Sequence, residues 1–309
     1  MNLAEHLHRA AKARPSSPAI YEGATLVQTY ADLNERAARL ASGLRFIMGL
    51  GAGERVAILS KNGPRYLEAL YAVWRAGLVA TPINARLHPS EIGYILRDVG
   101  ARLCLAGPGL GDAAATAADG APVAILEMGG ADYEALARSE PFAIAETQPD
   151  DPAWIFYTSG TTGRPKGAVL TNRNLLAMSA CCLLDVDSEA PWTTLLHAAP
   201  MSHGSGLYAI PYVMKGAAHV TPESGGFDPS EVYELLKVHK GVSFFAAPTM
   251  VKLLTDHDGD ADSRNLKTIA YGGGPMHVEE CVRALDRFGP KLSQLYGQGE
   301  SPMTITALT

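Results

Sequence analysis

The order of strand-like and helix-like stretches along the chain restricts its fold most strongly. Residues 55–59 (RVAIL) form an apolar run that predicts a buried strand, and residues 64–77 follow with helical spacing. Residues 78–82 again predict a strand, residues 89–99 a helix and residues 101–106 a strand. Strands that alternate with helices in this way are typical of a mainly parallel sheet covered by helices on both faces.

The second half of the chain continues the alternation. Its predicted strands are residues 193–198, 217–220, 241–246, 266–271 and 291–296, and its predicted helices are 229–239, 276–288 and a stretch from 250 onward. The expected fold is therefore α/β, with two packed, mainly parallel sheets flanked by helices. We expect one subdomain over residues 1–194 and a second over residues 195–309. The stretches 107–122 and 139–152 have little periodicity, and we interpret them as surface connections.

The composition excludes several classes of protein. With 47% hydrophobic and 19% charged residues, the 309-residue chain is typical of a globular protein. Its net charge of −6 gives no electrostatic basis for binding nucleic acid. The most apolar stretch, 175–184, is about half of the roughly 20 residues that a membrane span needs. Residues 1–13 lack the apolar region of a signal peptide. We expect a cytoplasmic protein without a membrane span, and a homodimer is compatible with the sequence.

The four cysteines give no metal or disulfide signal. Cys104, Cys181, Cys182 and Cys281 include no C-x-x-C pair, and two of them are adjacent in an apolar run. This usage favours buried, reduced thiols over disulfides or a zinc site.

The segment 157–167, YTSGTTGRPKG, carries the most specific chemical signal. It lies between two apolar runs, 154–157 and 168–170, that predict strands. Glycines let backbone N–H groups approach a ligand, the short hydroxyls add donors, and Lys166 adds a cation, a combination that suits a polyphosphate. The simpler interpretation is a Gly- and Thr-rich hairpin loop without a ligand. The spacing does not match the Walker phosphate loop, which disfavours a kinase or NTPase.

This segment resembles, over all eleven positions, the signature of the adenylate-forming superfamily. That superfamily includes acyl-CoA synthetases, luciferases and peptide-synthetase adenylation domains, and its loop wraps the β- and γ-phosphates of ATP. The resemblance implies a catalytic role for Lys166. It implies phosphate contacts for Thr158, Ser159, Gly160, Thr161, Thr162, Gly163 and Lys166.

Two further segments resemble motifs of the same family. Residues 200–206 (PMSHGSG) resemble its P-x-x-H-x-x-G motif, which implies a catalytic His203 that lines the acyl pocket and the path of the CoA arm. By itself, His203 would be interpreted as a buried structural histidine. Residues 271–276 (YGGGPM) resemble the family's adenine-packing turn, and also predict a tight turn between a strand and a helix. The implied adenine contacts are Gly272, Gly273, Gly274 and Pro275.

Residues 296–300 (YGQGE) resemble the family's Y-G-x-T-E motif. The resemblance implies that Tyr296 stacks on adenine and that Glu300 binds Mg²⁺ and takes part in catalysis. Gly297, Gln298 and Gly299 complete the predicted nucleotide contacts. Gly299 stands where threonine is common, so a hydroxyl contact to the α-phosphate is missing or replaced by backbone. The alternative for Glu300 is a solvated carboxylate at the end of a strand.

The resemblance covers the whole chain and implies an AMP-forming acyl-CoA synthetase. Such an enzyme uses ATP and Mg²⁺ to convert a carboxylic acid, here expected to be a fatty acid, to acyl-AMP and then, with coenzyme A, to the thioester. Full-length members of the family are longer. We therefore expect this chain to lack the β-barrel subdomain and the C-terminal domain, and to be inactive alone. The alternatives are an adenylation domain with a carrier protein or other acceptor, and a non-catalytic nucleotide-binding fragment. The sequence does not distinguish aliphatic from aryl acids.

Overall fold

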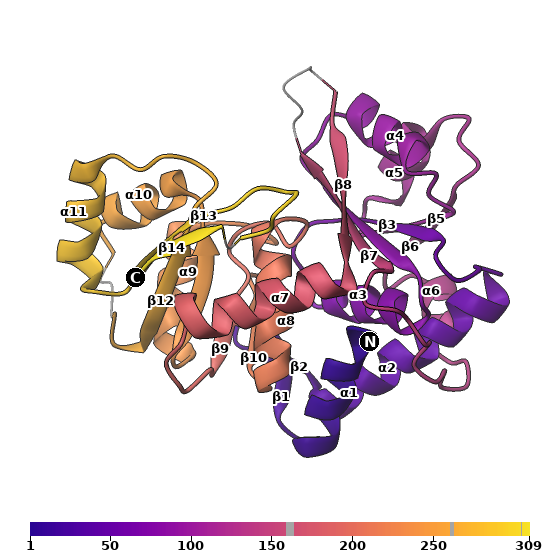
Figure 1. Ribbon diagram of the computed structural model, residues 1–309, viewed down its shortest axis with the longest axis horizontal. Coiled ribbons are helices and arrows are strands. Elements are labelled where there is room, and N and C mark those ends of the chain that lie inside the picture. The colour runs from indigo at the N-terminus through magenta and orange to yellow at the C-terminus, as the bar shows by residue number, and fades with distance from the viewer. Residues whose placement is uncertain (159–163, 260–262, 304) are drawn as a thin grey trace. The chain divides into compact units, whose positions relative to one another are not determined.

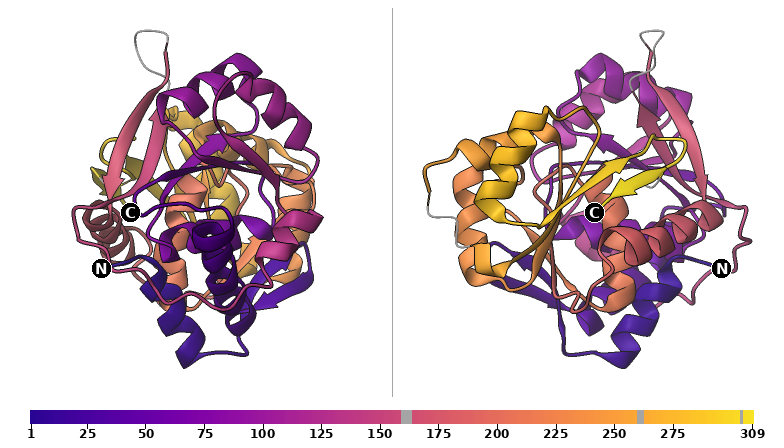
Figure 2. Two further views of the ribbon diagram at one scale, coloured as in Figure 1. Left: turned by 90° about the vertical axis from the view of Figure 1, so that its right-hand side faces the viewer. Right: turned by 60° about the vertical axis from the view of Figure 1, so that its left-hand side comes forward.

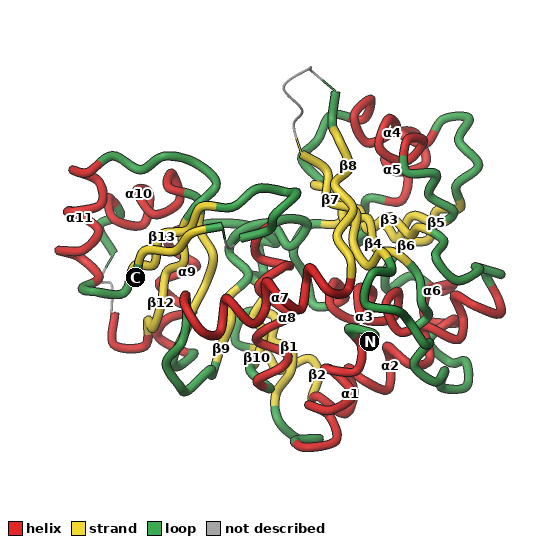
Figure 3. Tube along the Cα trace, viewed as in Figure 1, coloured by secondary structure: helices red, strands yellow, loops and turns green. Residues whose placement is uncertain are grey.

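The computed structural model describes residues 1–158, 164–259, 263–303 and 305–309, and divides into two compact units. Unit 1 comprises Met1–Pro15, Tyr30–Lys61 and Arg65–Leu176, and unit 2 comprises Ser16–Thr29, Asn62–Pro64 and Ala177–Thr309 (Figures 1 and 3). These units cross the predicted boundary at residue 194. The expectation of two subdomains divided at that residue stays a prediction.

Unit 1 is built on a six-stranded sheet in the order β6-β5-β3-β4-β7-β8. The pairs from β6 to β7 are parallel, and β8 is antiparallel to β7. The strands are β3 (Arg55–Ser60), β4 (Val79–Asn84), β5 (Leu103–Ala106), β6 (Ala124–Glu127), β7 (Pro152–Thr158) and β8 (Lys166–Thr171). Almost every residue of β3, β4 and β5 is buried, as expected for a parallel sheet covered on both faces.

Five of the helices of unit 1 form two packed groups. The helices are α1 (Ala4–Ala13), α2 (Tyr30–Ser42), α3 (Arg65–Arg75), α4 (Pro89–Asp98), α5 (Gly111–Ala118) and α6 (Ala131–Leu136), with a π-helix over Gly43–Ile47. α7 (Asn172–Cys181) begins in unit 1 and ends in unit 2. α1, α2 and α3 pack on one another, and α3 also contacts β3 and β4. α4 and α5 pack together (Figure 2). Their apolar residues share a core with Ala57 and Leu59 of β3.

Unit 2 is built on an eight-stranded sheet in the order β14-β13-β12-β11-β9-β10-β1-β2. The strands from β13 to β1 are parallel, and β14 and β2 are antiparallel edges. They are β1 (Pro18–Glu22), β2 (Thr25–Thr29), β9 (Thr194–Leu196), β10 (Ala218–Thr221), β11 (Val242–Ala246), β12 (Leu266–Tyr271), β13 (Leu292–Tyr296) and β14 (Thr306–Leu308). Together the two sheets confirm the predicted α/β fold with mainly parallel strands.

One face of this second sheet carries a large apolar core. Its helices are α9 (Pro229–Val238), α10 (Pro248–Asp256) and α11 (Val278–Phe288), whose buried residues pack against Phe244 and Ile269 of the sheet. α8 (Gly204–Lys215) contacts β9, β10 and β11. A π-helix (Cys182–Val186) follows α7, and a 3₁₀ turn covers Ser263–Asn265.

Two parts of the fold differ from the sequence expectations. α5 lies inside the stretch 107–122 that we interpreted as a connection. Its alanines have high helix propensity, and they let α5 lie so close to α4 that a Cβ on Gly93 would stand 2.2 Å from the Ala117 carbonyl oxygen. The β1–β2 hairpin joins the sheet of unit 2, because β1 pairs with β10 about 200 residues later. No helix among the described residues combines the length and the apolar character needed to cross a membrane.

Candidate functional site

The β7–β8 hairpin of unit 1 holds both ends of the predicted phosphate loop. Thr158 and Lys166 face each other as the last pair of the antiparallel ladder, and Tyr157 faces Gly167. Figure 1 shows the strands β7 and β8 that carry them. Lys166 is exposed to solvent. Ser159, Gly160, Thr161, Thr162 and Gly163 lie outside the described residues. The described part thus places one hydroxyl and one ammonium group at the base of the loop.

Tyr157 braces the base of this hairpin against α4. Its hydroxyl donates to Asp98 Oδ2 at 2.6 Å, and the Tyr94 hydroxyl lies 3.4 Å from Asp98 Oδ1. Burial, together with the bond to Asp98, raises the pKa of Tyr157 well above its ordinary value, so the phenol stays protonated. A Cβ on Gly167 would stand 2.9 Å from Ile155 Cγ2 and 3.1 Å from the Tyr157 ring. Packing within the hairpin therefore favours glycine at this position.

The other three predicted segments belong to unit 2 and follow parallel strands. The turn that ends at His203 follows β9, residues 272–275 follow β12, and residues 297–300 follow β13. Because β13, β12, β11 and β9 are parallel neighbours in the sheet, their carboxyl ends lie along the same end of the sheet. Open α/β sheets bind ligands outside the carboxyl ends of their strands, so the fold gathers these candidates at the edge where a ligand is expected.

The glycines after β12 allow a close backbone approach. A Cβ on Gly272 would stand 2.5 Å from the Leu295 carbonyl oxygen, and Gly273 has φ +83°, a conformation that side chains disfavour. Gly272 N–H donates to the Ala246 carbonyl at 3.2 Å. The segment is thus the tight turn that the sequence predicts. Contacts of adenine with Gly272, Gly273, Gly274 and Pro275 stay a prediction.

The turn after β13 presents an aromatic ring and a carboxylate. Tyr296 is 54% exposed, and its hydroxyl accepts a hydrogen bond from Gln298 Nε2 at 3.0 Å. Gly297 fits closely against the backbone of Met303, which a Cβ would approach to 2.6 Å. Glu300 is exposed. Within the described residues, no group of three or more His, Cys, Asp or Glu side chains could hold a metal ion.

His203 lies directly before α8 in a largely buried turn. Its Nδ1 lies 2.9 Å from the Ser202 hydroxyl, and burial lowers its pKa, so the ring is neutral at pH 7. A neutral imidazole can donate or accept a hydrogen bond but supplies no positive charge. Gly204 follows, where a Cβ would stand 2.7 Å from the Phe245 ring of β11. The structure thus packs the His203 turn on the end of β11.

Asn62 is a residue of this site that the sequence analysis missed. Its side-chain amide donates to the carbonyls of His197 at 2.7 Å and Ala199 at 2.8 Å, and its Oδ1 accepts from Met201 N–H at 2.8 Å. One buried side chain therefore satisfies three backbone groups between β9 and His203. The sequence analysis assigned residues 64–77 to a helix and gave Asn62 no role, and no local pattern indicates so distant a contact.

A buried pair of histidines was also missed. His197 Nδ1 lies 2.8 Å from the hydroxyl of Ser205, and His197 Nε2 lies 3.1 Å from His219 Nδ1. Both rings are fully buried, and they stack with centroids 5.3 Å apart. Burial lowers the pKa of His197 to about 3 and also lowers that of His219, so both are neutral. The sequence does contain a signal for this pair, because a histidine lies in each of two stretches, 193–198 and 217–220, that predict buried strands.

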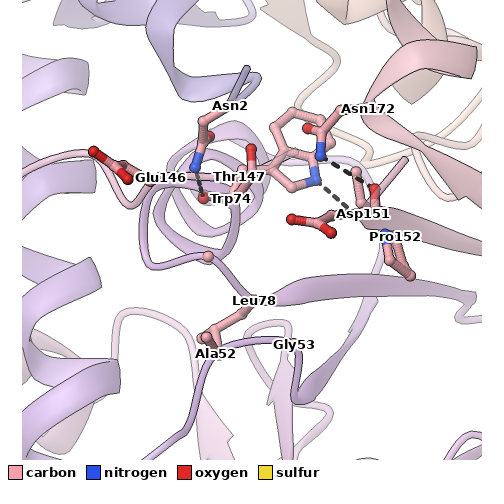
Figure 4. Close-up of a pocket in the computed structure, with 12 residues that line it drawn as sticks. Asn2, Ala52, Gly53, Trp74, Leu78, Glu146, Thr147, Asp151, Pro152 and Asn172 are labelled. Carbon is pink, nitrogen blue, oxygen red and sulfur yellow. Dashed lines mark hydrogen bonds between the residues drawn. The ribbon is translucent and has the colours of Figure 1, made fainter. Parts of the chain in front are cut away.

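A separate cavity in unit 1 contains none of the predicted site residues. It has a volume of about 260 Å³ and is lined by Asn2, Gly53, Leu78, Pro152, Asn172 and neighbouring residues (Figure 4). Gly53 and Leu78 precede β3 and β4, and Pro152 begins β7, so the cavity lies at the amino ends of these strands. The phosphate loop follows the opposite, carboxyl end of β7.

The motifs and the fold agree with a comparison against known families. The family model described as "AMP-binding enzyme" matches residues 7–309. The chain belongs to this family. The resemblance inferred from the four motifs is therefore confirmed.

Individual members of the family are similar over nearly the whole chain. A feruloyl-CoA synthase from Amycolatopsis sp is 35% identical over 304 residues, which cover 97% of this chain and 60% of that protein. A long-chain-fatty-acid–CoA ligase from Thermus thermophilus is 32% identical, with 99% of this chain and 59% of that protein covered. ATP-bound MatB from Rhodopseudomonas palustris superimposes with a TM-score of 0.83 at 27% identity, covering 100% of this chain and 62% of that one. The chain thus spans about 60% of the length of these curated relatives.

Proposed function

We propose that this chain is the ATP- and acid-binding portion of an AMP-forming acid–CoA ligase. The observation that carries the proposal is the sequence YTSGTTGRPKG, with Thr158 and Lys166 paired at the base of a hairpin. The membership of an AMP-binding family and the other three motifs support it. The roles assigned to individual residues below are part of this proposal.

In the proposed reaction, a carboxylate oxygen of the acid attacks the α-phosphorus of ATP, and pyrophosphate leaves. Two anions must approach each other, so the protein has to offset charge and fix their positions. In this proposal, Lys166 and the loop from Thr158, including Ser159, Gly160, Thr161, Thr162 and Gly163, hold the β- and γ-phosphates. Lys166 screens negative charge as the pyrophosphate departs.

The other three motifs are proposed to contact the adenylate and the acyl group. Gly272, Gly273, Gly274 and Pro275 pack on adenine, and the exposed ring of Tyr296 stacks on it, with Gly297, Gln298 and Gly299 alongside. His203, as a neutral imidazole, borders the acyl group and the approach of CoA. The thiolate of CoA then attacks the acyl carbonyl carbon, and AMP leaves as the thioester forms.

The proposed metal ligand fits a nucleotide-bound ion. Mg²⁺ usually takes one or two protein carboxylates and completes its shell with phosphate oxygens and water. Glu300 is exposed, and within the described residues it belongs to no group of three or more His, Cys, Asp or Glu side chains that could hold a metal ion, so it suits Mg²⁺ carried by ATP better than an all-protein site. When bound, the ion would neutralise phosphate charge.

We propose a fatty acid as the substrate and an aryl acid as the alternative. The names of the two curated relatives, a long-chain-fatty-acid–CoA ligase and a feruloyl-CoA synthase, represent both classes. Pyrophosphate release from the whole protein, with dodecanoate and ferulate as probes, separates these classes. Addition of free CoA or of an acyl-carrier protein then identifies the acceptor. No pyrophosphate with any tested acid, despite ATP binding, favours a nucleotide-binding role without catalysis. The 309-residue chain alone is expected to release little pyrophosphate.

The first test is calorimetric titration of the chain with MgATP. Lys166→Ala should weaken binding about tenfold, because one charge-assisted contact to phosphate is lost. Lys12→Ala is the matched control, since Lys12 is also an exposed lysine of unit 1 but lies on α1. Equal affinities of Lys166→Ala and the parent chain, or no binding by the parent, contradict the proposal.

A further inference from the structure

The turn between β9 and α8 is held in place by side chains that lie outside the P-x-x-H-x-x-G motif. The N–H of His197 still donates to the Val220 carbonyl of β10 at 2.8 Å, and the backbone then leaves the sheet. The carbonyls of His197 and Ala199 and the N–H of Met201 bond the Asn62 side chain instead. Buried backbone groups must find partners, and the Asn62 amide is the partner of all three. Asn62 itself is 8% exposed. The arm of the turn before His203 is therefore fixed by one amide.

The arm after His203 is fixed by the two buried histidines. Ser205 lies in the first turn of α8, and its hydroxyl meets His197 Nδ1. His219 Nε2 is buried and has no hydrogen-bond partner among the described residues. An unpaired lone pair costs less than an unpaired N–H group. This assigns the His219 proton to Nδ1, which donates to His197 Nε2, so that His197 Nδ1–H donates to Ser205 Oγ.

We propose that Asn62, His197 and His219 are positioning residues that set the place of His203 against the acyl group. The inference rests on the proposed function, in which His203 borders that group. Asn62 holds the backbone up to Met201, and the histidine pair holds Ser205. His203 therefore lies between two residues that are anchored independently of each other. Loss of either anchor displaces the imidazole and leaves the adenylate contacts after β12 and β13 in place.

Calorimetry can separate the acyl contribution from that of the nucleotide. The probes are 5′-O-sulfamoyladenosine, which lacks an acyl group, and its N-dodecanoyl and N-feruloyl derivatives, which mimic acyl-AMP. The ratio of dissociation constants with and without the acyl group measures the acyl contribution. In the 309-residue chain, His197→Leu should reduce this ratio about tenfold for the better acyl probe, with little change for the probe without an acyl group.

Conservative and control variants distinguish positioning from general loss of structure. His197→Asn keeps an N–H close to the Nδ1 position and should restore most of the ratio. His239→Leu is the matched control, because His239 is also a buried histidine of unit 2 but bonds the distant Gly23 carbonyl at 2.9 Å. It should leave the ratio unchanged. If His197→Leu does not fold, Ser205→Ala removes the same hydrogen bond from the helix side and should give the same reduction.

Nitrogen-15 NMR of the ring nitrogens gives a second readout. We expect neutral His197 and His219 with both protons on Nδ1, a changed His203 signal in His197→Leu, and a nearly unchanged one in His197→Asn. Protons on Nε2 in either buried ring overturn the assigned direction of the hydrogen bonds. An unchanged acyl ratio in folded His197→Leu or Ser205→Ala overturns the positioning role. Failure of the parent chain to bind any adenosine probe instead contradicts the proposed function.

Discussion

The hairpin of unit 1 and the His203 turn of unit 2 are built in different ways. The β7–β8 hairpin is built on its own antiparallel ladder, which runs from the pair Pro152–Thr171 to the pair Thr158–Lys166. Near the loop, its side-chain link to another element is the bond from Tyr157 of β7 to Asp98 of α4. The His203 turn is largely buried. It is fixed by Asn62, which lies far away in the sequence, and by His197 together with His219 of the neighbouring strand β10. The conformation of a loop such as 158–166 can be encoded by a contiguous motif, whereas the position of the His203 turn depends on side chains from other parts of the sequence.

The largest expected difference between the two regions is their response to pH. Burial lowers the pKa of His197 to about 3 and that of His219 below its ordinary value of 6.5. The unfolded chain therefore binds more protons than the folded one below about pH 6.5, and stability falls as pH falls. Between pH 7 and pH 5 each histidine should cost about 2 kcal/mol, or about 4 kcal/mol together.

Urea unfolding at several pH values checks this prediction. The His197→Asn, His219→Leu double variant lacks both groups, so its free energy of unfolding should change about 4 kcal/mol less than that of the parent over the same range. His6 and His203, whose pKa values burial also lowers, are present in both chains and cancel in the difference. Parallel pH profiles of the two chains would show that the pair titrates normally.

A smaller effect is expected for Asn62→Ala. The substitution leaves two carbonyls and one N–H buried without partners, and should lower the free energy of unfolding by about 3 kcal/mol. Asn84→Ala is the matched control, because the Asn84 side chain accepts one bond, from Arg86 N–H at 3.0 Å, in a partly exposed position. The control should cost less than about 1 kcal/mol. Equal costs would mean that water replaces the amide of Asn62.

The same contrast explains how far the sequence could predict this molecule. Uninterrupted apolar runs such as residues 55–59 predicted the buried strands, because a parallel sheet covered on both faces tolerates few polar residues. The four motifs predicted the family, since each is contiguous. Asn62 and His219 could not be predicted, because their contacts with the His203 turn depend on how distant strands pair. The pairing of β1 with β10 was missed for the same reason.

The smallest predicted effect concerns the anchor of the hairpin. Tyr157→Phe removes the hydrogen bond to Asp98 but keeps the ring that packs against Gly167. Asp98 lies at the end of α4, where water can replace the lost donor, so the free energy of unfolding should fall by about 1 kcal/mol. Tyr94→Phe removes the longer, more exposed 3.4 Å contact to the same carboxylate. It should lower the free energy of unfolding by only about 0.3 kcal/mol. If urea unfolding gives Tyr157→Phe a cost as large as that of Asn62→Ala, the hairpin depends on distant side chains as much as the His203 turn does. The distinction between a hairpin that its own sequence specifies and a turn that distant side chains hold in place then does not apply to this protein.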